Sequence, residues 1–366
     1  MTRRTARDLP TGHSRLRLLS AAAVVALASA LLAACTWTAA PTGTIPVVQS
    51  RPAPAAAKSA QAAATPAPAA AKPAPAPAPA GKVLLGLLSE LPGRTGADSV
   101  RFREQQLGRK LAIDSHYYDW ADPFPGTREA DDAANGRIPM ITWWGVSNSQ
   151  VINGSRDGLI AARAAAVKSF GRPLFLRWGA EMNGNWYAWS GVASGNDPTR
   201  YVAAYRHIHD IFVAAGATNA RWVWAPNADS HPGGTSATSW NNWRSYYPGD
   251  AYVDWVGIDG YNWGTVEGNV WQSPEAIFGP VYRDYAGRKP IMLAETSSVE
   301  SGGSKAAWVS SLSTWVKAHA AVQALVWFDT NESSTHLDWR IDSSAASLTA
   351  FKSLATDGWF ARTTLP

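Results

Sequence analysis

The chain has 366 residues, among them 19 tryptophans and a single cysteine, so an intrachain disulfide is excluded. Its formal net charge of +5 is unevenly distributed: residues 1–35 carry +4, residues 36–81 carry +3 and residues 82–366 carry −2. The basic balance belongs to the two N-terminal segments, which removes the main argument for nucleic-acid binding by the rest of the chain.

Residues 1–35 have the layout of a secretory signal peptide. Five arginines and one aspartate are followed by an apolar run over residues 18–34 that ends at Cys35. The run is shorter than the roughly 20 apolar residues of a membrane span and has no second basic flank. Leu32-Ala33-Ala34-Cys35 resembles a bacterial lipobox, which implies cleavage before Cys35 and lipidation of its thiol. The alternative is a stray cysteine in an ordinary secretion signal. We expect an exported protein at the extracellular face of the cell envelope, attached to the membrane only through this lipid.

Residues 36–81 consist mostly of alanine and proline, with PAPAPAPA near their end. Repeated proline favours an extended, disordered linker, which has too few large apolar residues to build a core. The remaining residues, 82–366, suit one large domain and hold 18 of the 19 tryptophans. Indole rings are flat apolar surfaces that suit both protein cores and the C–H faces of sugars.

Eight apolar runs rich in β-branched and aromatic residues recur in this domain, separated by stretches able to form helices. Because most runs are continuous rather than alternating, they indicate strands buried on both faces, as in parallel sheets. Eight strand–helix units predict an α/β fold, the closed (β/α)8 TIM barrel. The alternative is an open doubly wound sheet, although no glycine-rich phosphate turn follows the first run. The runs cover residues 83–88, 111–118, 138–144, 174–178, 220–224, 253–258, 290–294 and 322–328.

Helix signals lie between these runs. Asp197-Pro198 and Ser273-Pro274 each place a capping side chain before a proline at the first helical position. Residues 240–247 carry only a faint helix pattern, and Asp131-Asp132 is interpreted as an exposed helix face. The clearer helical stretches are residues 159–170, 199–215 and 304–320.

The active site of such a barrel lies at the carboxyl ends of its strands. Reading only those positions finds acids and aromatic residues crowded at one end. Two glutamates stand out, because Glu181 and Glu295 each follow an apolar strand that has no need of a charge. The full set is His116, Tyr117, Asp119, Trp143, Trp144, Arg177, Glu181, Asn227, Asp229, Asp259, Tyr261, Glu295, Trp327 and Asp329.

Hydrolysis of a glycosidic bond requires a protonated carboxyl at the leaving oxygen and a second carboxylate at the anomeric carbon. Strands four and seven lie across the barrel mouth from each other, so Glu181 and Glu295 could flank one sugar. The alternative is that each glutamate only pairs with a barrel arginine such as Arg177.

Four segments resemble glycoside hydrolase family 26, the β-mannanases and their relatives. They are RWGAEMNGNWYAW around Glu181, KPIMLAET around Glu295, VGIDGYNW on the sixth strand and VWFDTN on the eighth. They occur in the family's order, and the similarity extends from about residue 83 to residue 359. The resemblance implies a retaining enzyme on a (β/α)8 barrel.

The same resemblance implies roles for single residues. Glu181 would be the general acid/base, and Glu295 the nucleophile. Tyr261 would donate a hydrogen bond to Glu295, and Arg177 would lie beneath it as a charge partner. Trp186 and Trp327 would be sugar platforms, for which packing at the barrel top is the alternative. The expected substrate-binding residues are Trp186, Tyr261, Trp327, Arg177, Trp143, His116 and Asn227.

One position departs from the family pattern. Mannanases of the family usually have histidine directly before the acid/base, where this chain has Ala180. We therefore predict retaining hydrolysis of internal bonds in a β-linked polysaccharide, either β-1,4-mannan or a β-1,3/1,4-glucan. The alternative is a non-catalytic, cell-surface glycan-binding lipoprotein. Neither an HExxH motif nor paired cysteines occur, so no metal or cofactor is predicted; the expected partner is the polysaccharide, bound by a monomer.

Overall fold

The structure, a computed structural model, describes residues 81–332 and 337–365. The predicted signal peptide, the lipidation at Cys35 and all of the predicted linker before Gly81 lie outside the described residues. None of the helices within the described ranges has the length and apolar character that a membrane span needs.

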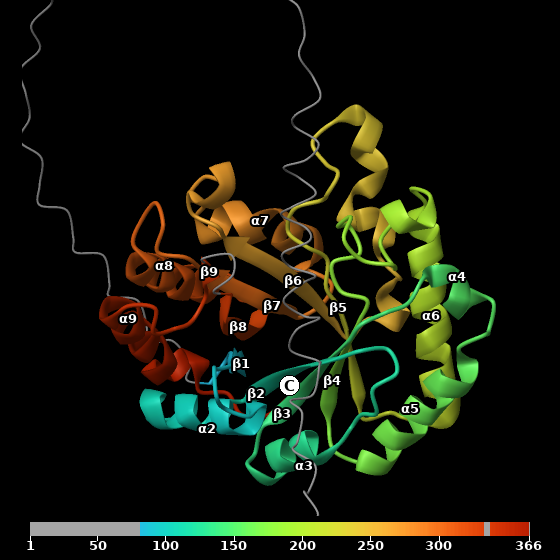
Figure 1. Ribbon diagram of the computed structural model, residues 1–366, viewed down its shortest axis with the longest axis horizontal. Coiled ribbons are helices and arrows are strands. Elements are labelled where there is room, and N and C mark those ends of the chain that lie inside the picture. The colour runs from blue at the N-terminus through green and yellow to red at the C-terminus, as the bar shows by residue number, and fades with distance from the viewer. Residues whose placement is uncertain (1–80, 333–336, 366) are drawn as a thin grey trace, which may run out of the picture. The chain divides into compact units, whose positions relative to one another are not determined.

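Eight parallel strands form a closed barrel (Figure 1). Each strand pairs with the next along the chain, and β8 returns to pair with β1, joining Ala324–Thr330 to Leu84–Glu90. This last pairing closes the sheet, so the barrel prediction is confirmed and the open doubly wound sheet is wrong. The strands are β1 (Leu84–Glu90), β2 (Ile113–Tyr118), β3 (Ile138–Trp143), β4 (Leu174–Trp178), β5 (Ala220–Trp224), β6 (Trp255–Asn262), β7 (Ile291–Ser298) and β8 (Val322–Glu332); a short β9 (Leu337–Asp338) pairs antiparallel with β8.

Helices surround the strands, and their starts agree with the capping signals (Figure 1). The Asp197 side chain accepts a hydrogen bond from the backbone N–H of Thr199, and Ser273 accepts one from Ala276. Both helices therefore begin at the predicted proline. The helices are α2 (Gly96–Leu107), α3 (Thr127–Ala134), α4 (Asn148–Ile152), α5 (Asp157–Phe170), α6 (Pro198–Ala215), α7 (Pro274–Tyr285), α8 (Lys305–Ala318) and α9 (Ala345–Thr356).

The connection between β5 and β6 contains short 3-10 turns instead of an α-helix. The faint pattern over residues 240–247 corresponds to the turns Ser236–Asn241 and Trp243–Tyr246. Asn242 separates them, because its backbone is extended and its side chain accepts a hydrogen bond from the N–H of Arg244.

Two apolar layers hold the barrel together. The inner layer fills the barrel, and the outer layer lies between the strands and the helices. The largest outer side chains are Trp143, Trp178, Trp224 and Trp327, all fully buried. Because side chains alternate along a strand, the neighbours of these tryptophans point into the barrel. Arg177, directly before Trp178, is one of them.

Candidate active site

Glu181 lies three residues beyond the end of β4, in an unusual backbone conformation. Its φ is +55°, in the left-handed region that side chains other than glycine rarely adopt. Two backbone hydrogen bonds stabilise it: the Glu181 N–H donates to Ala225 at 2.8 Å, and the Gly184 N–H donates to the Glu181 carbonyl at 2.9 Å. A strained backbone that its neighbours hold in place is typical of a functional position.

Two side chains bind the carboxylate of Glu181. Asn227 donates from Nδ2 to Oε1 at 2.7 Å, and the indole N–H of Trp186 donates to Oε2 at 3.1 Å. Both were expected in the site, and both lie there. They fix one carboxylate oxygen each, so the group has a defined orientation.

Three donors bind the carboxylate of Glu295 on β7. Arg177 and Tyr117 donate to Oε1, and Tyr261 donates to Oε2 at 2.6 Å. The expected hydrogen bond from Tyr261 and the expected ion pair with Arg177 are both present. Tyr117 was noted only as a strand-end residue. The signal for its role is alternation along β2, which turns it into the barrel between two outward-facing neighbours.

Arg177 is fully buried and connects the site across the barrel. Its Nη1 donates to Asp259 at 2.7 Å, and its Nε donates to Thr142 at 3.0 Å. Its third nitrogen binds Glu295. One guanidinium therefore serves two carboxylates on neighbouring strands, β6 and β7.

The two glutamates come together at the barrel mouth. Single carboxylate oxygens of Glu181, Asp259 and Glu295 lie within 4.8 Å of one another. Retaining glycosidases place their two carboxyl groups about 5–5.5 Å apart, whereas inverting enzymes need roughly 6.5–9.5 Å to admit a water. Three oxygens at this spacing are also a ligand set for a divalent cation, but Arg177 already supplies positive charge to two of these carboxylates.

The environments of the two glutamates differ. Burial, followed by the negative charge of Glu295, raises the pKa of Glu181 to about 7, although the Asn227 and Trp186 donors oppose the shift. At neutral pH Glu181 is therefore protonated in a large fraction of molecules. Glu295 instead accepts hydrogen bonds from one cation and two phenols. One proton donor and one carboxylate face each other, the arrangement that acid-assisted cleavage of an acetal requires.

Comparison with known proteins agrees with this geometry. The family model of glycosyl hydrolase family 26 matches residues 140–341, more than half of the chain. Endoglucanase H of Acetivibrio thermocellus is 41% identical over 261 residues, which cover 69% of this chain and 28% of that protein. The chain belongs to glycosyl hydrolase family 26.

A second curated relative is more distant. Mannan endo-1,4-beta-mannosidase A and B of Caldalkalibacillus mannanilyticus is 27% identical over 178 residues, covering 45% of this chain and 30% of that protein. The chain thus matches less than a third of the length of either curated relative.

Solved structures of mannanases share the barrel. The endo-beta-1,4-mannanase double mutant of Cellulomonas fimi has a TM-score of 0.56 at 20% identity, covering 77% of this chain and 74% of that one. The beta-mannanase of Bacteroides ovatus has a TM-score of 0.53 at 18% identity, covering 76% and 89%. At these identities the likeness concerns the fold alone.

The predictions that Trp327 and Trp143 contact the sugar are wrong. Trp327 is 0% exposed, donates from Nε1 to the Trp339 carbonyl at 2.8 Å and packs against Phe351 of α9. Trp143 is also 0% exposed and stacks on Trp120 at a ring distance of 4.4 Å. Both point outward from the barrel, so no glycan at the mouth can touch them.

The residues that follow these tryptophans lie in the site instead. Trp144 is half-buried and meets the ring of Tyr117 edge-on at 5.9 Å. Phe328 is half-buried and meets the ring of Tyr261 edge-on at 5.7 Å. Because Tyr117 and Tyr261 both bind Glu295, these two aromatic rings lie close to the Glu295 carboxylate.

His116 does not face the mouth either. It is 1% exposed and points toward α3, where its Nδ1 lies 2.6 Å from Glu129 and its Nε2 lies 2.9 Å from both Asp114 and Asp132. Burial opposes a charge here, but the surrounding carboxylates outweigh it and raise the pKa of His116 to about 10. The result is a buried imidazolium between helix and strand. Asp132 is therefore a core residue, and its interpretation as an exposed helix face was wrong.

Further aromatic side chains adjoin Glu181. Trp186 lies 5.5 Å from His231 between ring centroids, and Tyr187 lies 5.8 Å from Trp144. Trp186 and Tyr187 are half-buried, so their rings keep part of their surface exposed. Aromatic faces beside a carboxylate pair suit the binding of sugar rings.

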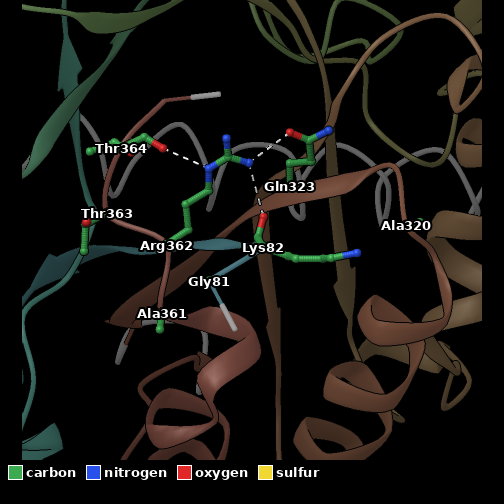
Figure 2. A pocket seen from close by; sticks show the side chains of 8 residues that line it. All are labelled: Gly81, Lys82, Ala320, Gln323, Ala361, Arg362, Thr363 and Thr364. Atoms are coloured by element: carbon green, nitrogen blue, oxygen red, sulfur yellow. Dashed lines mark hydrogen bonds between the residues drawn. The ribbon is translucent and has the colours of Figure 1, made fainter. Parts of the chain in front are cut away.

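A separate hollow of about 630 Å³ lies at the opposite end of the barrel, near the amino ends of β1 and β8. Figure 2 shows its lining, in which Arg362 donates to Gln323 at 3.2 Å and to the Lys82 carbonyl at 3.5 Å. No carboxylate or thiol lines this hollow.

Proposed function

We propose that residues 82–366 are the catalytic domain of an exported, lipid-anchored enzyme. It hydrolyses internal β-glycosidic bonds of a β-linked polysaccharide and retains the configuration at the anomeric carbon. The proposal rests mainly on the proximity of Glu181 and Glu295, because one carboxylate oxygen of each lies within 4.8 Å of the other. Family membership and the names of the relatives support the same reaction class.

In the first step, Glu181 gives its proton to the oxygen of the leaving sugar while Glu295 attacks the anomeric carbon. The glycosidic bond breaks, and an ester forms between the glycan and Glu295. Arg177, Tyr117 and Tyr261 hold Glu295 ready for this attack.

In the second step, the negative charge of Glu295 is absent because the carboxylate is esterified. The pKa of Glu181 then falls, since that charge is one cause of its raised value. Glu181, now ionised, removes a proton from water as the water attacks the anomeric carbon. The ester bond breaks, and both glutamates return to their starting states.

For the substrate, we propose a β-1,3/1,4-glucan as the first candidate. Endoglucanase H is 41% identical to this chain, against 27% for the mannosidase relative. Ala180 is 7% exposed and packs in the inner apolar layer, so its methyl group offers a sugar no hydrogen bond where mannanases have an imidazole. β-1,4-mannan remains the second candidate because several curated relatives are named mannan endo-1,4-beta-mannosidases.

The lipobox ending at Cys35 and the Ala/Pro segment that follows it support the rest of the proposal. The lipid would hold the protein at the extracellular face of the envelope, and the extended linker would keep the barrel away from the membrane surface. We propose that the barrel acts there as a monomer.

The test is hydrolysis of mixed-linkage β-glucan, β-1,4-mannan and β-1,3-glucan, with reducing ends measured over time. Proton NMR then identifies the anomer formed first. We expect shortened oligosaccharides from one polymer and an initial β-anomer; an initial α-anomer contradicts the retaining mechanism. The glycan-binding lipoprotein is supported instead if wild-type protein releases no reducing ends from any polymer but binds one of them, and if Glu295→Gln binds that polymer equally well.

A further inference from the structure

We propose that Asn183 is a positioning residue that acts through Asn227 on the general acid/base. This inference rests on the proposed role of Glu181. Asn183 lies in the loop after β4, two residues beyond Glu181, and its side chain is 0% exposed. A buried carboxamide needs partners for both its oxygen and its nitrogen, and these partners are the basis of the proposal.

The Asn183 carboxamide binds both sides of the Asn227 peptide. Its Oδ1 accepts from the Asn227 N–H at 2.9 Å, and its Nδ2 donates to the Asn227 carbonyl at 2.9 Å. The same Nδ2 reaches the hydroxyl of Ser230 at 3.1 Å. This pair of hydrogen bonds imitates the contact that a neighbouring strand would make.

Within residues 81–332 and 337–365, no strand lies at that place. β4 ends at Trp178, before the loop that carries Asn183. On the opposite side, Asn227 is bridged to Asp259 of β6 through hydrogen bonds of the adjoining peptides at 2.7 and 3.0 Å. Without Asn183, the backbone of Asn227 would be held from one side only.

The backbone of Asn183 ties down the rest of the same loop. Its carbonyl accepts from the His231 N–H at 2.8 Å and from Nδ2 of Asn241 at 2.8 Å. Asn241 is buried and is itself bound by the hydroxyl of Tyr246 at 2.5 Å. The segment after β4 and the segment after β5 are therefore one hydrogen-bonded unit around Asn183.

The consequence reaches Glu181 through the Asn227 side chain. The Asp229 N–H donates to Oδ1 of Asn227 at 2.9 Å, which turns Nδ2 toward Glu181 at 2.7 Å. This donor favours the ionised carboxylate and so opposes burial and Glu295, the two causes that raise the pKa of Glu181. Asn183 thereby contributes to both the orientation and the acidity of the proton donor.

The test measures the pKa of the Glu181 carboxyl by NMR in protein carrying carbon-13 at the glutamate side-chain carboxyls. The signal is assigned by its loss in Glu181→Gln. We expect Asn183→Ala to raise this pKa by about half a unit to one unit, in the same direction as Asn227→Ala. Because one residue acts through the other, the double variant should show no further rise beyond Asn227→Ala.

Asn148→Ala is the matched control. Asn148 is 1% exposed and also joins two segments, through the Trp189 carbonyl at 2.9 Å and Ser194 at 2.8 Å, but it contacts neither Glu181 nor Asn227. We expect a lower Tm in both Asn148→Ala and Asn183→Ala, and a changed Glu181 titration only in the latter. If Asn183→Ala does not fold, Asn183→Ser keeps one hydrogen-bonding group and should give a smaller shift.

A wild-type titration in Asn183→Ala, or a shift that adds to that of Asn227→Ala, overturns the proposal. The measurement needs no substrate, so it stands apart from the proposed function. Failure of wild-type protein on every polysaccharide contradicts the function, whereas an unmoved titration contradicts only the role of Asn183. If the enzyme is active, the alkaline limb of the kcat–pH profile of Asn183→Ala should move to higher pH by the same amount as the pKa of Glu181. KM should change less than kcat.

Discussion

Arg177 donates to Glu295 and to Asp259 at once, so one positive charge is shared by two buried carboxylates on neighbouring strands. Burial, only partly offset by Arg177, raises the pKa of Asp259. Glu181 is the third acid of the group, and its raised pKa keeps it protonated in a large fraction of molecules at neutral pH. The balance of charge in the site therefore depends on this single guanidinium.

Replacement of Arg177 should cost both stability and activity. In Arg177→Met two carboxylates lose their cation, which destabilises a buried site by about 3 kcal/mol or more. Glu295 also loses a donor that orients it, so kcat of the folded protein should fall by about 100-fold or more. Chemical denaturation and initial rates on the active polysaccharide measure the two effects.

Arg103→Met is the control for this variant. Arg103 is likewise 0% exposed and binds two carboxylates, Asp329 and Asp342, which are different from the two that Arg177 binds. We expect a similar loss of stability and a kcat within about tenfold of wild type. An equal fall of kcat in both variants would attribute the Arg177 effect to general unfolding.

The pKa of Glu181 predicts a pH effect on stability. Its pKa is raised from about 4.5 to about 7 on folding, so the folded state binds more protons between these values. Stability contributed by this group is therefore highest below pH 4.5 and is lost as pH rises through 7. Glu181→Gln should be more stable than wild type at pH 8, by on the order of 2 kcal/mol, and the difference should shrink toward pH 4.5. Urea unfolding at several pH values tests the sign.

The two glutamates should respond differently to the leaving group. Glu181→Ala lacks the proton donor and should lose about 100-fold to 10,000-fold on polysaccharide. It should still cleave aryl glycosides slowly when their leaving groups need no proton. Glu295→Ala lacks the nucleophile and should be nearly inactive on both substrates. Rates with dinitrophenyl and methyl glycosides of the active oligosaccharide separate the roles, and wild-type activity in either variant contradicts the assignment.

Membrane attachment is testable separately. In the native bacterium, Cys35→Ala should prevent incorporation of labelled fatty acid and release the protein from the membrane fraction. Activity per mole should stay unchanged, since the 46 residues of the predicted linker separate Cys35 from the barrel domain. Labelling that persists in Cys35→Ala contradicts the lipobox interpretation.

The barrel and the carboxylate pair could be predicted because their signals are local. Continuous apolar runs mark strands buried on both faces, and Ser273-Pro274 marks a helix start that the structure confirms. Glu181 and Glu295 could be chosen because each follows such a run. Tyr261 and Arg177 could be placed through the family motifs, and both bind Glu295 as expected.

The errors share one physical cause. In a strand buried on both faces, apolar residues do not alternate with polar ones, so the sequence does not tell which side chains point inward. A shift of one residue exchanges the two faces. Trp143 was predicted from its strand-end position and Trp327 from the family resemblance, whereas Trp144 and Phe328 face the site. His116 was misplaced by one residue, because the inward residue at this end of β2 is Tyr117.

Trp186 and Trp327 allow a direct test of this distinction. Trp327→Ala removes a fully buried ring and should lower stability by about 3–5 kcal/mol, with KM for the polysaccharide unchanged in the folded protein. Trp186→Ala removes a half-buried ring at Glu181 and should raise KM about threefold to tenfold, with a small change in Tm.

Trp186→Phe keeps an aromatic face but removes the indole N–H that donates to Glu181. It should therefore largely preserve KM while moving the alkaline limb of kcat to higher pH, because one donor that lowers the pKa of Glu181 is lost. If folded Trp327→Ala has a higher KM than wild type, Trp327 contributes to substrate binding and this distinction is wrong.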